Sequence, residues 1–198
     1  MGNAETIESY VAEKTFQLTR DNTSYNRAAL ARLRRGVGRD PGDLPEIWEI
    51  TLAELPEELS SRDGKATRAE LAIHTALTLF ALHQQGKTES VNSKGISFGR
   101  MARSLVAHDK SNEQTVKRRF DAALTSKDFF EFSRHARSLI LLSKSNPNDC
   151  GLDYPRFAKD LFLYQNPDFR ISVMLKWGQD FWILAKTTQT QEEGKQNE

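Results

Sequence analysis

The sequence predicts an all-α protein built of an N-terminal and a C-terminal helical bundle, and three observations support this. Apolar residues recur at spacings of three and four along most of the 198 residues, which is the period of an amphipathic helix. No stretch alternates polar and apolar residues as a half-buried strand would, and no hairpin dipeptide joins two such stretches. A polar, glycine-flanked segment, GKTESVNSKG at 86–95, divides the helical pattern in two. We therefore expect bundles over 1–95 and 96–186, followed by a disordered polar tail at 187–198.

The N-terminal part carries four expected helices, each with an apolar stripe. They run over 5–20, 24–35, 44–55 and 66–85. Ser24 is expected to cap the second helix, which Gly36 and Gly38 close, and Pro56 stops the third. The fourth helix is apolar on most of its circumference, which is typical of a central core helix.

Two histidines in this fourth helix raise the question of a metal site. His74 and His83 are nine residues apart, which is not the i, i+4 spacing that puts two ligands on one helix face. No carboxylate-rich motif accompanies them. We expect both histidines to be packed or to lie at the rim of the core, and we expect no metal and no cofactor.

The C-terminal part carries five expected helices. They run over 95–108, 113–126, 127–143, 154–164 and 169–184. Ser111 and Gln114 form a possible capping box in front of the second of these. The last two helices are rich in aromatic residues, namely Phe157, Phe162, Tyr164, Trp177, Phe181 and Trp182. We expect these rings in the core and at interfaces rather than in a base-stacking platform.

The net charge of +1 conceals a strong segregation of charge along the chain. Residues 1–39 hold seven bases and four acids (+3), 40–63 one base and eight acids (−7), and 90–144 eleven bases and five acids (+6). Such asymmetry suggests one face for an anionic polymer and another for a different partner. Equally, the acidic block could neutralise the first arginine cluster within the fold.

The sequence shows no catalytic signature. A nucleophile elbow, a P-loop, a dinucleotide fingerprint and an H-E-x-x-H helix are all absent. The paired acids Glu57 and Glu58 lie in an exposed acidic run, where solubilising carboxylates are far commoner than an acid–base pair. Cys150 is the sole cysteine, which excludes an internal disulfide and a multi-cysteine zinc site. We therefore expect that the protein is not an enzyme.

The N-terminal sequence and the hydropathy give no sign of a membrane. No run approaches the ~20 apolar residues of a membrane span, and MGNAETIESYVAEKTF lacks the apolar segment of a signal peptide. We expect a cytoplasmic protein with no membrane partner.

Arginine-rich clusters are the main functional feature. The stretch 27–39 holds five arginines in thirteen residues without an acid. Cations at a helix C-terminus interact favourably with the helix dipole, which accounts for Arg34 and Arg35 but not for five arginines. Arginine outnumbers lysine in the basic clusters, and its planar fork can donate two hydrogen bonds to one phosphate.

Four basic patches fall on helix faces that we expect to be exposed, so a continuous basic surface is our hypothesis. Such a surface would contact phosphate backbones without reading sequence. Scattered, solvated charge is the alternative. The candidate nucleic-acid-binding residues are Arg34, Arg35, Arg39, Arg100, Arg103, Lys117, Arg118, Arg119, Arg134, Arg137 and Lys144.

Five motifs follow one another with compatible spacing from about Tyr25 to about Trp182. They are RAALARLRRGVG, ALTLFALHQ, GISFGRMARSL, KRRFDAALTSKDFFEFSRHARSLI and LDYPRFAKDLFLYQNPDFRISVMLKWGQDFW. Together they resemble the CasB family, the small subunits of the type I-E CRISPR surveillance complex, Cascade. GISFGR followed by the RRF block is the most specific part. In the first 24 residues and in the tail after Lys186 we find no usable match to the family.

The resemblance implies an all-helical, non-catalytic subunit, present as two copies in the complex and in contact with its backbone and large subunits. It implies contact with the guide RNA–target DNA assembly, and above all with the displaced non-target single-stranded DNA of the R-loop. The residues to which its motifs point are Arg34, Arg35, Arg100, Lys117, Arg118, Arg119, Arg134 and Arg137. Because opening a duplex on a guide is a near-balanced exchange, backbone contacts can tip it toward the open state. The acidic segment 40–63 would then serve a neighbouring subunit or keep its face off the DNA.

Two other functions share part of this pattern. A stand-alone helical DNA-binding regulator would need a compact tri-helical reader with polar base-contacting positions, which we do not find. A nucleic-acid enzyme would need a metal or carboxylate cluster. Genomic neighbourhood, or co-purification with guide RNA and the other Cascade subunits, would separate the three.

Overall fold

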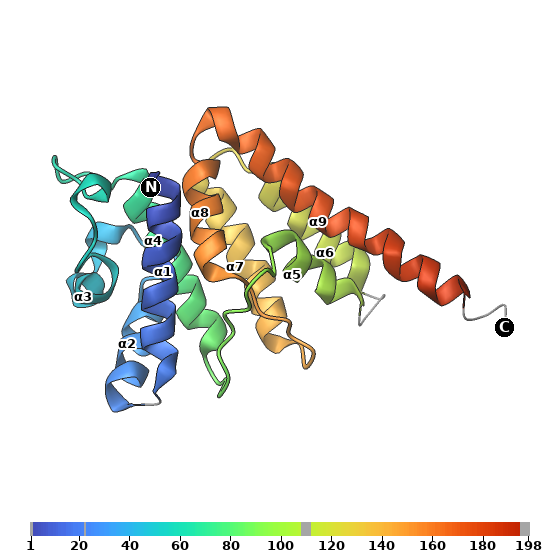
Figure 1. Ribbon diagram of the computed structural model, residues 1–198, viewed down its shortest axis with the longest axis horizontal. Helices are drawn as coiled ribbons and strands as arrows, with labels where there is room; N and C mark the ends of the chain where they lie inside the picture. The colour runs from blue at the N-terminus through green and yellow to red at the C-terminus, as the bar shows by residue number, and fades with distance from the viewer. Residues whose placement is uncertain (1, 22, 108–111, 195–198) are drawn as a thin grey trace.

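Helices, loops and short 3-10 turns make up the part of the chain that the structure describes (Figure 1). The computed structural model describes residues 2–21, 23–107 and 112–194, with no strand among them. Its α-helices are α1 (Asn3–Arg20), α2 (Ser24–Arg35), α3 (Trp48–Thr51), α4 (Arg68–Gln84), α5 (Phe98–Ala107), α6 (Glu113–Leu124), α7 (Phe129–Ser145), α8 (Tyr154–Tyr164) and α9 (Pro167–Gly194). Three 3-10 turns lie between α2 and α4: η1 (Pro41–Asp43), η2 (Pro45–Ile47) and η3 (Glu57–Leu59). The all-α prediction is confirmed.

Helix α4 is the central core helix, as its sequence predicts. Ala72, Leu77 and Phe80 are fully buried. A capping box fixes its first turn: Thr67 Oγ1 accepts a hydrogen bond from the Glu70 N–H at 3.1 Å, and the Glu70 carboxylate accepts one from the Thr67 N–H at 2.7 Å. Because α4 packs against α1, α2, α7 and α8, it joins the two ends of the fold.

Helix α8 ties the second half of the chain to the first. It packs along α1 and α4 and lies beside α1 in Figure 1. Ala158 and Leu161 are fully buried in this packing. At its edge Lys159 Nζ lies 2.9 Å from a Glu8 carboxylate oxygen and 3.2 Å from one of Glu5. Helix α1 therefore completes the core on this side.

An aromatic cluster around Trp177 of α9 forms the core of the second half. The Trp177 ring stacks on Phe132 with centroids 5.3 Å apart and meets Phe98 edge-on at 5.2 Å. Its Nε1 donates a hydrogen bond to Asp160 at 2.9 Å, so the polar end of the buried ring is satisfied. Of the six aromatic residues noted in the sequence, Phe157, Tyr164, Trp177 and Phe181 are buried, Phe162 is partly buried, and Trp182 is 44% exposed.

Helices α5 and α9 approach each other so closely at Gly99 that no side chain fits there. A Cβ atom at this position would collide with the backbone carbonyl of Trp177. Next to it, Ser97 Oγ donates to the Asp180 carboxylate at 2.5 Å. The GISFGR motif therefore docks α9 onto α5 through a position that requires glycine.

The prediction of one helix over 44–55 is wrong. Its place is taken by η2 and the single turn α3. Leu44 precedes a proline, which disfavours helical backbone, and it adopts φ −132° and ψ 86°. At the other end Glu54 has a left-handed φ of 63° and turns the chain so that its carboxylate meets Lys14 at 2.7 Å. The predicted stripe is therefore broken at both ends by backbone turns.

Smaller differences concern the ends of three segments. Thr23, rather than Ser24, caps α2, because its Oγ1 accepts from the Asn26 N–H at 3.0 Å. Helix α9 continues to Gly194, into the stretch expected to be a disordered tail. Ser111 of the expected capping box lies outside the described residues, as do residues 195–198. Over the described ranges, no helix combines the length and the apolar character needed to cross a bilayer.

Candidate nucleic-acid interface

One face of α7 carries a row of outward side chains, which we call the α7 stripe. Its members recur at i, i+4, i+7, i+11 and i+14, and they are Phe130, Arg134, Arg137, Leu141 and Lys144. The opposite face of α7 is buried, so the helical period itself turns this row outward. Lys144 Nζ donates to Gln85 Oε1 at 2.7 Å. The row thus runs alongside α4, against which α7 packs.

The loop after α2 brings a further arginine to the α7 stripe. Arg39, Arg134 and Arg137 line one cavity of about 110 Å³ between this loop, α4 and α7, which we call the arginine pocket. Within the described residues, none of these three side chains has a hydrogen-bond or ion-pair partner. No acidic residue of the described ranges lines this cavity. Three cations around one cavity produce a positive local potential that attracts an anion.

The rest of the first arginine cluster is partly neutralised inside the fold. Arg35 lies 3.0 Å from Glu46, and Arg32 lies 3.9 Å from Glu49, both of the acidic segment. Arg34 lies away from the acidic segment, beside the loop that follows α4. Partial burial there lowers the pKa of its guanidinium. The acidic segment therefore neutralises part of the first arginine cluster.

Three basic candidates of α5 and α6 contact α9 or each other's helix. Arg100 lies 3.8 Å from Asp180, and Arg103 lies 3.8 Å from Glu113. Lys117 Nζ stands 4.9 Å from the centre of the Trp182 ring, a cation–π geometry. These charges still reach solvent but are partly balanced by local partners.

The last two candidates are neighbours on α6 with different surroundings. Arg119 donates to Ser138 Oγ of α7 at 2.8 Å and is half-buried. Arg118 is exposed. Of the eleven predicted residues, the structure thus gathers Arg39, Arg134 and Arg137 at one pocket and places Lys144 farther along the α7 stripe. The other seven lie elsewhere, namely Arg34 and Arg35 at the end of α2, and Arg100, Arg103, Lys117, Arg118 and Arg119 on α5 and α6.

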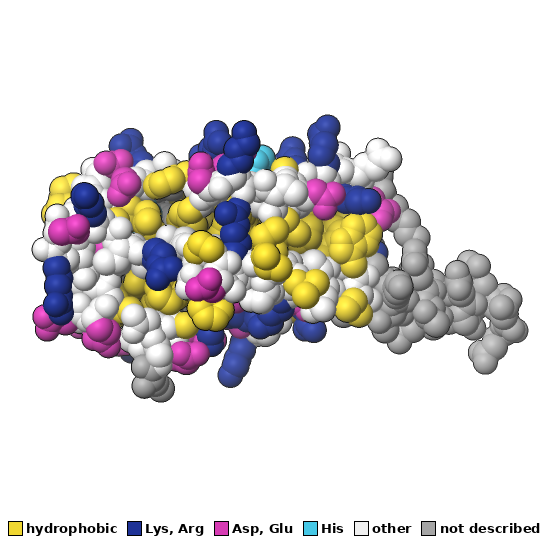
Figure 2. All heavy atoms as spheres, turned by 90° about the horizontal axis from the view of Figure 1, so that it is seen from above, with side chains coloured by type: hydrophobic (Ala, Val, Ile, Leu, Met, Phe, Trp, Pro, Cys, Tyr) yellow, Lys and Arg dark blue, Asp and Glu magenta, His cyan; other side chains and the backbone are white. Residues whose placement is uncertain are grey.

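Helix α9 also exposes an apolar face. Ile171 is 76% exposed, Leu175 60% and Trp182 44%. Figure 2 shows apolar side chains gathered over the region of α9, with basic side chains projecting along the edges of the molecule. Large exposed apolar side chains of this kind are typical of a protein that docks onto others.

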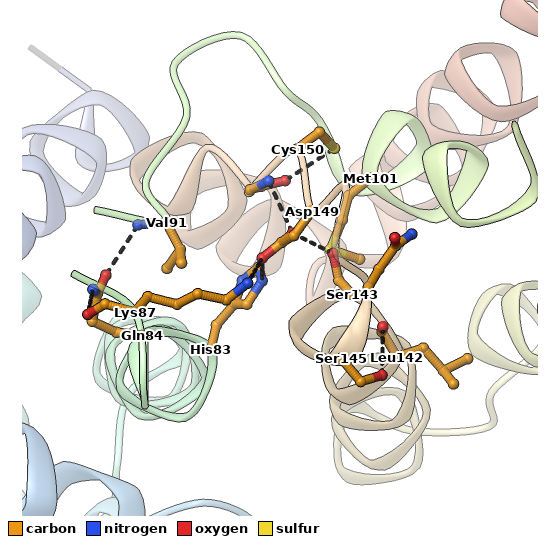
Figure 3. A network of polar contacts seen from close by, with 12 residues as sticks. His83, Gln84, Lys87, Val91, Met101, Leu142, Ser143, Ser145, Asp149 and Cys150 are labelled. Carbon is orange, nitrogen blue, oxygen red and sulfur yellow. Dashed lines mark hydrogen bonds and ion pairs between the residues drawn. The ribbon is translucent and has the colours of Figure 1, made fainter. Parts of the chain in front are cut away.

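A buried polar network joins α4 to the loop between α7 and α8 (Figure 3). His83 Nε2 lies 2.8 Å from Asp149 Oδ2, and Ser143 Oγ donates to Asp149 Oδ1 at 2.7 Å. His83 Nδ1 lies 3.0 Å from the Tyr154 hydroxyl, and Lys87 Nζ lies 3.3 Å from Asp149. Although a serine, a histidine and an aspartate meet here, the serine donates to the aspartate and not to the histidine, so it is not an activated nucleophile.

The hydrogen bonds of this network determine the charge of Asp149. Burial alone would raise its pKa, but the bonds from His83, Ser143 and the Gly151 N–H outweigh burial and hold the pKa of Asp149 well below its usual range. An ionised Asp149 accepts all of these bonds, so His83 donates to it from Nε2. The network is a structural connection between the two halves of the chain.

Fold and surface together define an all-helical protein in which helices bury an aromatic core and bases gather on one face of α7. Among the described residues, no group of three or more metal-ligating side chains comes together. The chain belongs to the family of CRISPR-associated protein Cse2, whose family model matches residues 29–182. Membership of this family implies a small subunit of the multi-subunit CRISPR complex Cascade. The resemblance seen in the sequence is confirmed.

Two solved structures share the fold. The crystal structure of CasB from Thermobifida fusca is 23% identical, with 89% of this chain and 97% of that chain covered and a TM-score of 0.74. The crystal structure of M. ruber CasB is 19% identical, with 91% and 97% covered and a TM-score of 0.68. The arrangement of helices is therefore that of CasB proteins.

Proposed function

We propose that this protein is the non-catalytic small subunit of a type I-E Cascade and that it stabilises target DNA, above all the displaced non-target strand of the R-loop. The observation that carries the proposal is the meeting of Arg39, Arg134 and Arg137, without an acidic partner among the described residues, on the face formed by α7 and the loop after α2. Arginine binds phosphate through paired, charge-assisted hydrogen bonds. Three such side chains can hold a backbone segment of a single strand.

The energetics of R-loop formation make modest contacts effective. The guide–target heteroduplex is about as stable as the DNA duplex that it replaces, so contacts to the displaced strand shift the balance. Arg118, Arg100, Arg103 and Lys117 are additional candidates along the same strand. Arg100, Arg103 and Lys117 have local partners, which predict smaller individual effects than those of the three pocket arginines.

The proposed partners are the backbone and large subunits of Cascade, the guide RNA–target DNA assembly and a second copy of the chain, all acting in the cytoplasm. The exposed face of α9, with Ile171 and Leu175, is suited to contact with a protein subunit. The acidic segment 40–63 forms ion pairs with Arg32 and Arg35 and none with the pocket arginines among the described residues. The charges of the pocket arginines thus remain available to DNA.

The test is the salt dependence of R-loop affinity in the reconstituted complex. The variant Arg39→Ala/Arg134→Ala/Arg137→Ala should bind target DNA more weakly, to a similar extent across target sequences. Each phosphate contact to a single strand contributes about 0.7 to the log–log salt slope, so the loss of three contacts should flatten the slope by roughly two units. Subunit occupancy is measured on the same samples.

A matched control removes the same charge elsewhere. Arg20→Ala/Arg62→Ala/Lys65→Ala changes three exposed bases of the first half of the chain, outside the arginine pocket. This control should leave affinity and slope near wild type. If the pocket variant shows an unaltered slope at full occupancy, the proposed DNA contact is wrong.

A further inference from the structure

The arginine pocket extends past its arginines to buried polar atoms. Its lining includes His74, which is 2% exposed, and Ser133. His74 Nδ1 and Ser133 Oγ are the buried side-chain polar atoms without a hydrogen bond in the described part of the chain. Leaving such atoms unpaired costs free energy, which a bound group could recover.

The hydrogen bond on the other side of the His74 ring fixes what Nδ1 can do. Nε2 lies 3.0 Å from the Gly36 carbonyl oxygen, and because a carbonyl only accepts, Nε2 is the donor. Burial lowers the pKa of His74, although the Gly36 and Arg39 carbonyls and the charges of Asp40 and Asp43 oppose this. Burial thus favours the neutral ring, in which Nδ1 is an acceptor in need of a donor. The Ser133 hydroxyl can take either role.

Most of the remaining wall of the pocket is apolar, with two threonines, Thr75 and Thr78, among the lining residues. Phe130, half-exposed at 49%, lines the pocket, as do Val37 and Leu71. The cavity of about 110 Å³ is far larger than the ~10–15 Å³ that one water needs. The site thus combines an aromatic ring, apolar walls, a buried acceptor and three cations at one opening.

We propose that the arginine pocket binds one unstacked nucleobase of single-stranded nucleic acid, with the flanking phosphates on Arg134 and Arg137 and the edge of the base on His74 and Ser133. The inference rests on the proposed function, since it supplies the strand. Every standard nucleobase offers an N–H donor on its pairing edge, and every base has a face that can stack on Phe130. Binding is therefore tolerant of sequence but depends on the presence of a base.

Other ligands use only part of this site. A free phosphate, or a carboxylate side chain from a neighbouring subunit, would satisfy the arginines but would leave the apolar walls and the His74 acceptor without a partner. A metal ion would be repelled by three arginines. A nucleotide is the chemical class that uses every group of the pocket.

The test compares a strand with bases to a strand without them. The full-length chain is titrated at low salt, by fluorescence anisotropy, against an oligothymidylate of about 12 nucleotides and against an abasic chain of the same length and charge. Wild type should bind the base-bearing strand at least about fivefold more tightly, the lower end of base–aromatic stacking. Phe130→Ala and Ser133→Ala should each reduce this ratio while affinity for the abasic chain stays the same.

The controls separate binding from folding. Ser133→Ala removes a buried hydroxyl that has no partner among the described residues, so the thermal midpoint of the variant should equal or exceed that of wild type. If the hydroxyl were merely structural, the affinities for the base-bearing and the abasic strand would both stay unchanged. Phe169→Ala removes a ring of matched exposure, 48%, on α9 and should keep the wild-type ratio.

Three results would overturn the inference: equal affinity of wild type for the two strands, absence of binding to both, or a Phe130→Ala variant that keeps the base preference. A Phe130→Ala variant that instead loses occupancy in the assembled complex, with the preference intact, would show that a neighbouring protein fills the pocket. If bases prove irrelevant while the triple arginine variant still weakens R-loop binding, this inference fails and the proposed function stands. If the arginine variant also has no effect, the proposed function itself fails.

Discussion

His83 Nε2 and Asp149 Oδ2 lie 2.8 Å apart although 66 residues separate them in the chain. The bond connects α4, the central helix of the fold, to the loop between α7 and α8, and both side chains are almost fully buried. Since Asp149 also accepts from Ser143 and the Gly151 N–H, one carboxylate organises the whole loop. Removal of this carboxylate should therefore lower the stability of the whole fold.

We expect Asp149→Ala to lower the free energy of unfolding by about 2–4 kcal/mol, because it leaves buried donors of His83 and Ser143 without an acceptor. Chemical denaturation followed by circular dichroism measures this. Asp121→Ala removes an exposed carboxylate on α6 and should change stability by no more than about 0.5 kcal/mol. Equal effects of the two substitutions would show that the network is not a structural connection.

The same carboxylate predicts a pH dependence of stability. The pKa of Asp149 is lower in the folded protein than in the unfolded chain, where it is about 3.9. Its contribution is therefore complete well above pH 4 and is lost as the pH falls toward the folded pKa. The difference in unfolding free energy between wild type and Asp149→Asn should shrink from pH 6 to pH 3. A constant difference over this range would contradict the assigned charge state.

The contact between α5 and α9 predicts opposite outcomes for two glycines. Gly99→Ala places a methyl group against the Trp177 carbonyl and should destabilise the protein by about 1–3 kcal/mol or more. Gly178→Ala adds the same methyl group to α9 where nothing lies within 4 Å, and it should be neutral or stabilising by up to about 1 kcal/mol. Thermal melting of both variants checks the pair. A Gly99→Ala protein as stable as wild type would refute the close approach.

The capping box of α4 predicts a cost at its first residue. Thr67 Oγ1 accepts from the Glu70 N–H and also donates to the Leu59 carbonyl at 2.7 Å. Thr67→Ala should therefore lower the unfolding free energy by about 1–2 kcal/mol. Thr88→Ala, in the exposed loop after α4, is the comparison and should have little effect. If both melt alike, the cap contributes nothing.

The long helices were predictable because an apolar stripe of period 3.6 is a local property. Helix α4 was expected over 66–85 and runs over 68–84, and the helix expected over 154–164 is α8 itself. The prediction of a helix over 44–55 was wrong because it rested on the spacing of apolar residues. That spacing contains no information about the effect of the proline at 45 or about the left-handed turn at Glu54. The turn at Glu54 is accompanied by an ion pair with the distant Lys14. A contact of this kind does not change the spacing of apolar residues and so cannot be predicted from it.

The candidate site was predictable in its residue types and less so in its grouping. The basic face of α7 follows from helical spacing alone. The prediction missed Phe130, although its position four residues before Arg134 puts it on the same helix face. The position of Arg39 beside Arg134 and Arg137 depends on the path of the loop after α2, which the sequence pattern does not predict. His74 and Ser133, 59 positions apart, line one cavity, and His83 contacts Asp149, only through tertiary packing that no local pattern encodes.

The position of α1 has a consequence for how the protein can be shortened. The family model begins at residue 29, so all of α1 lies outside it, yet Ile7 and Val11 of this helix are fully buried and α1 packs along α8. The boundary of the family-model match is therefore not the boundary of the folding unit. A recombinant fragment that starts at residue 29, where this match begins, should uncover an apolar side of α8 and self-associate, even though all three arginines of the arginine pocket would still be present.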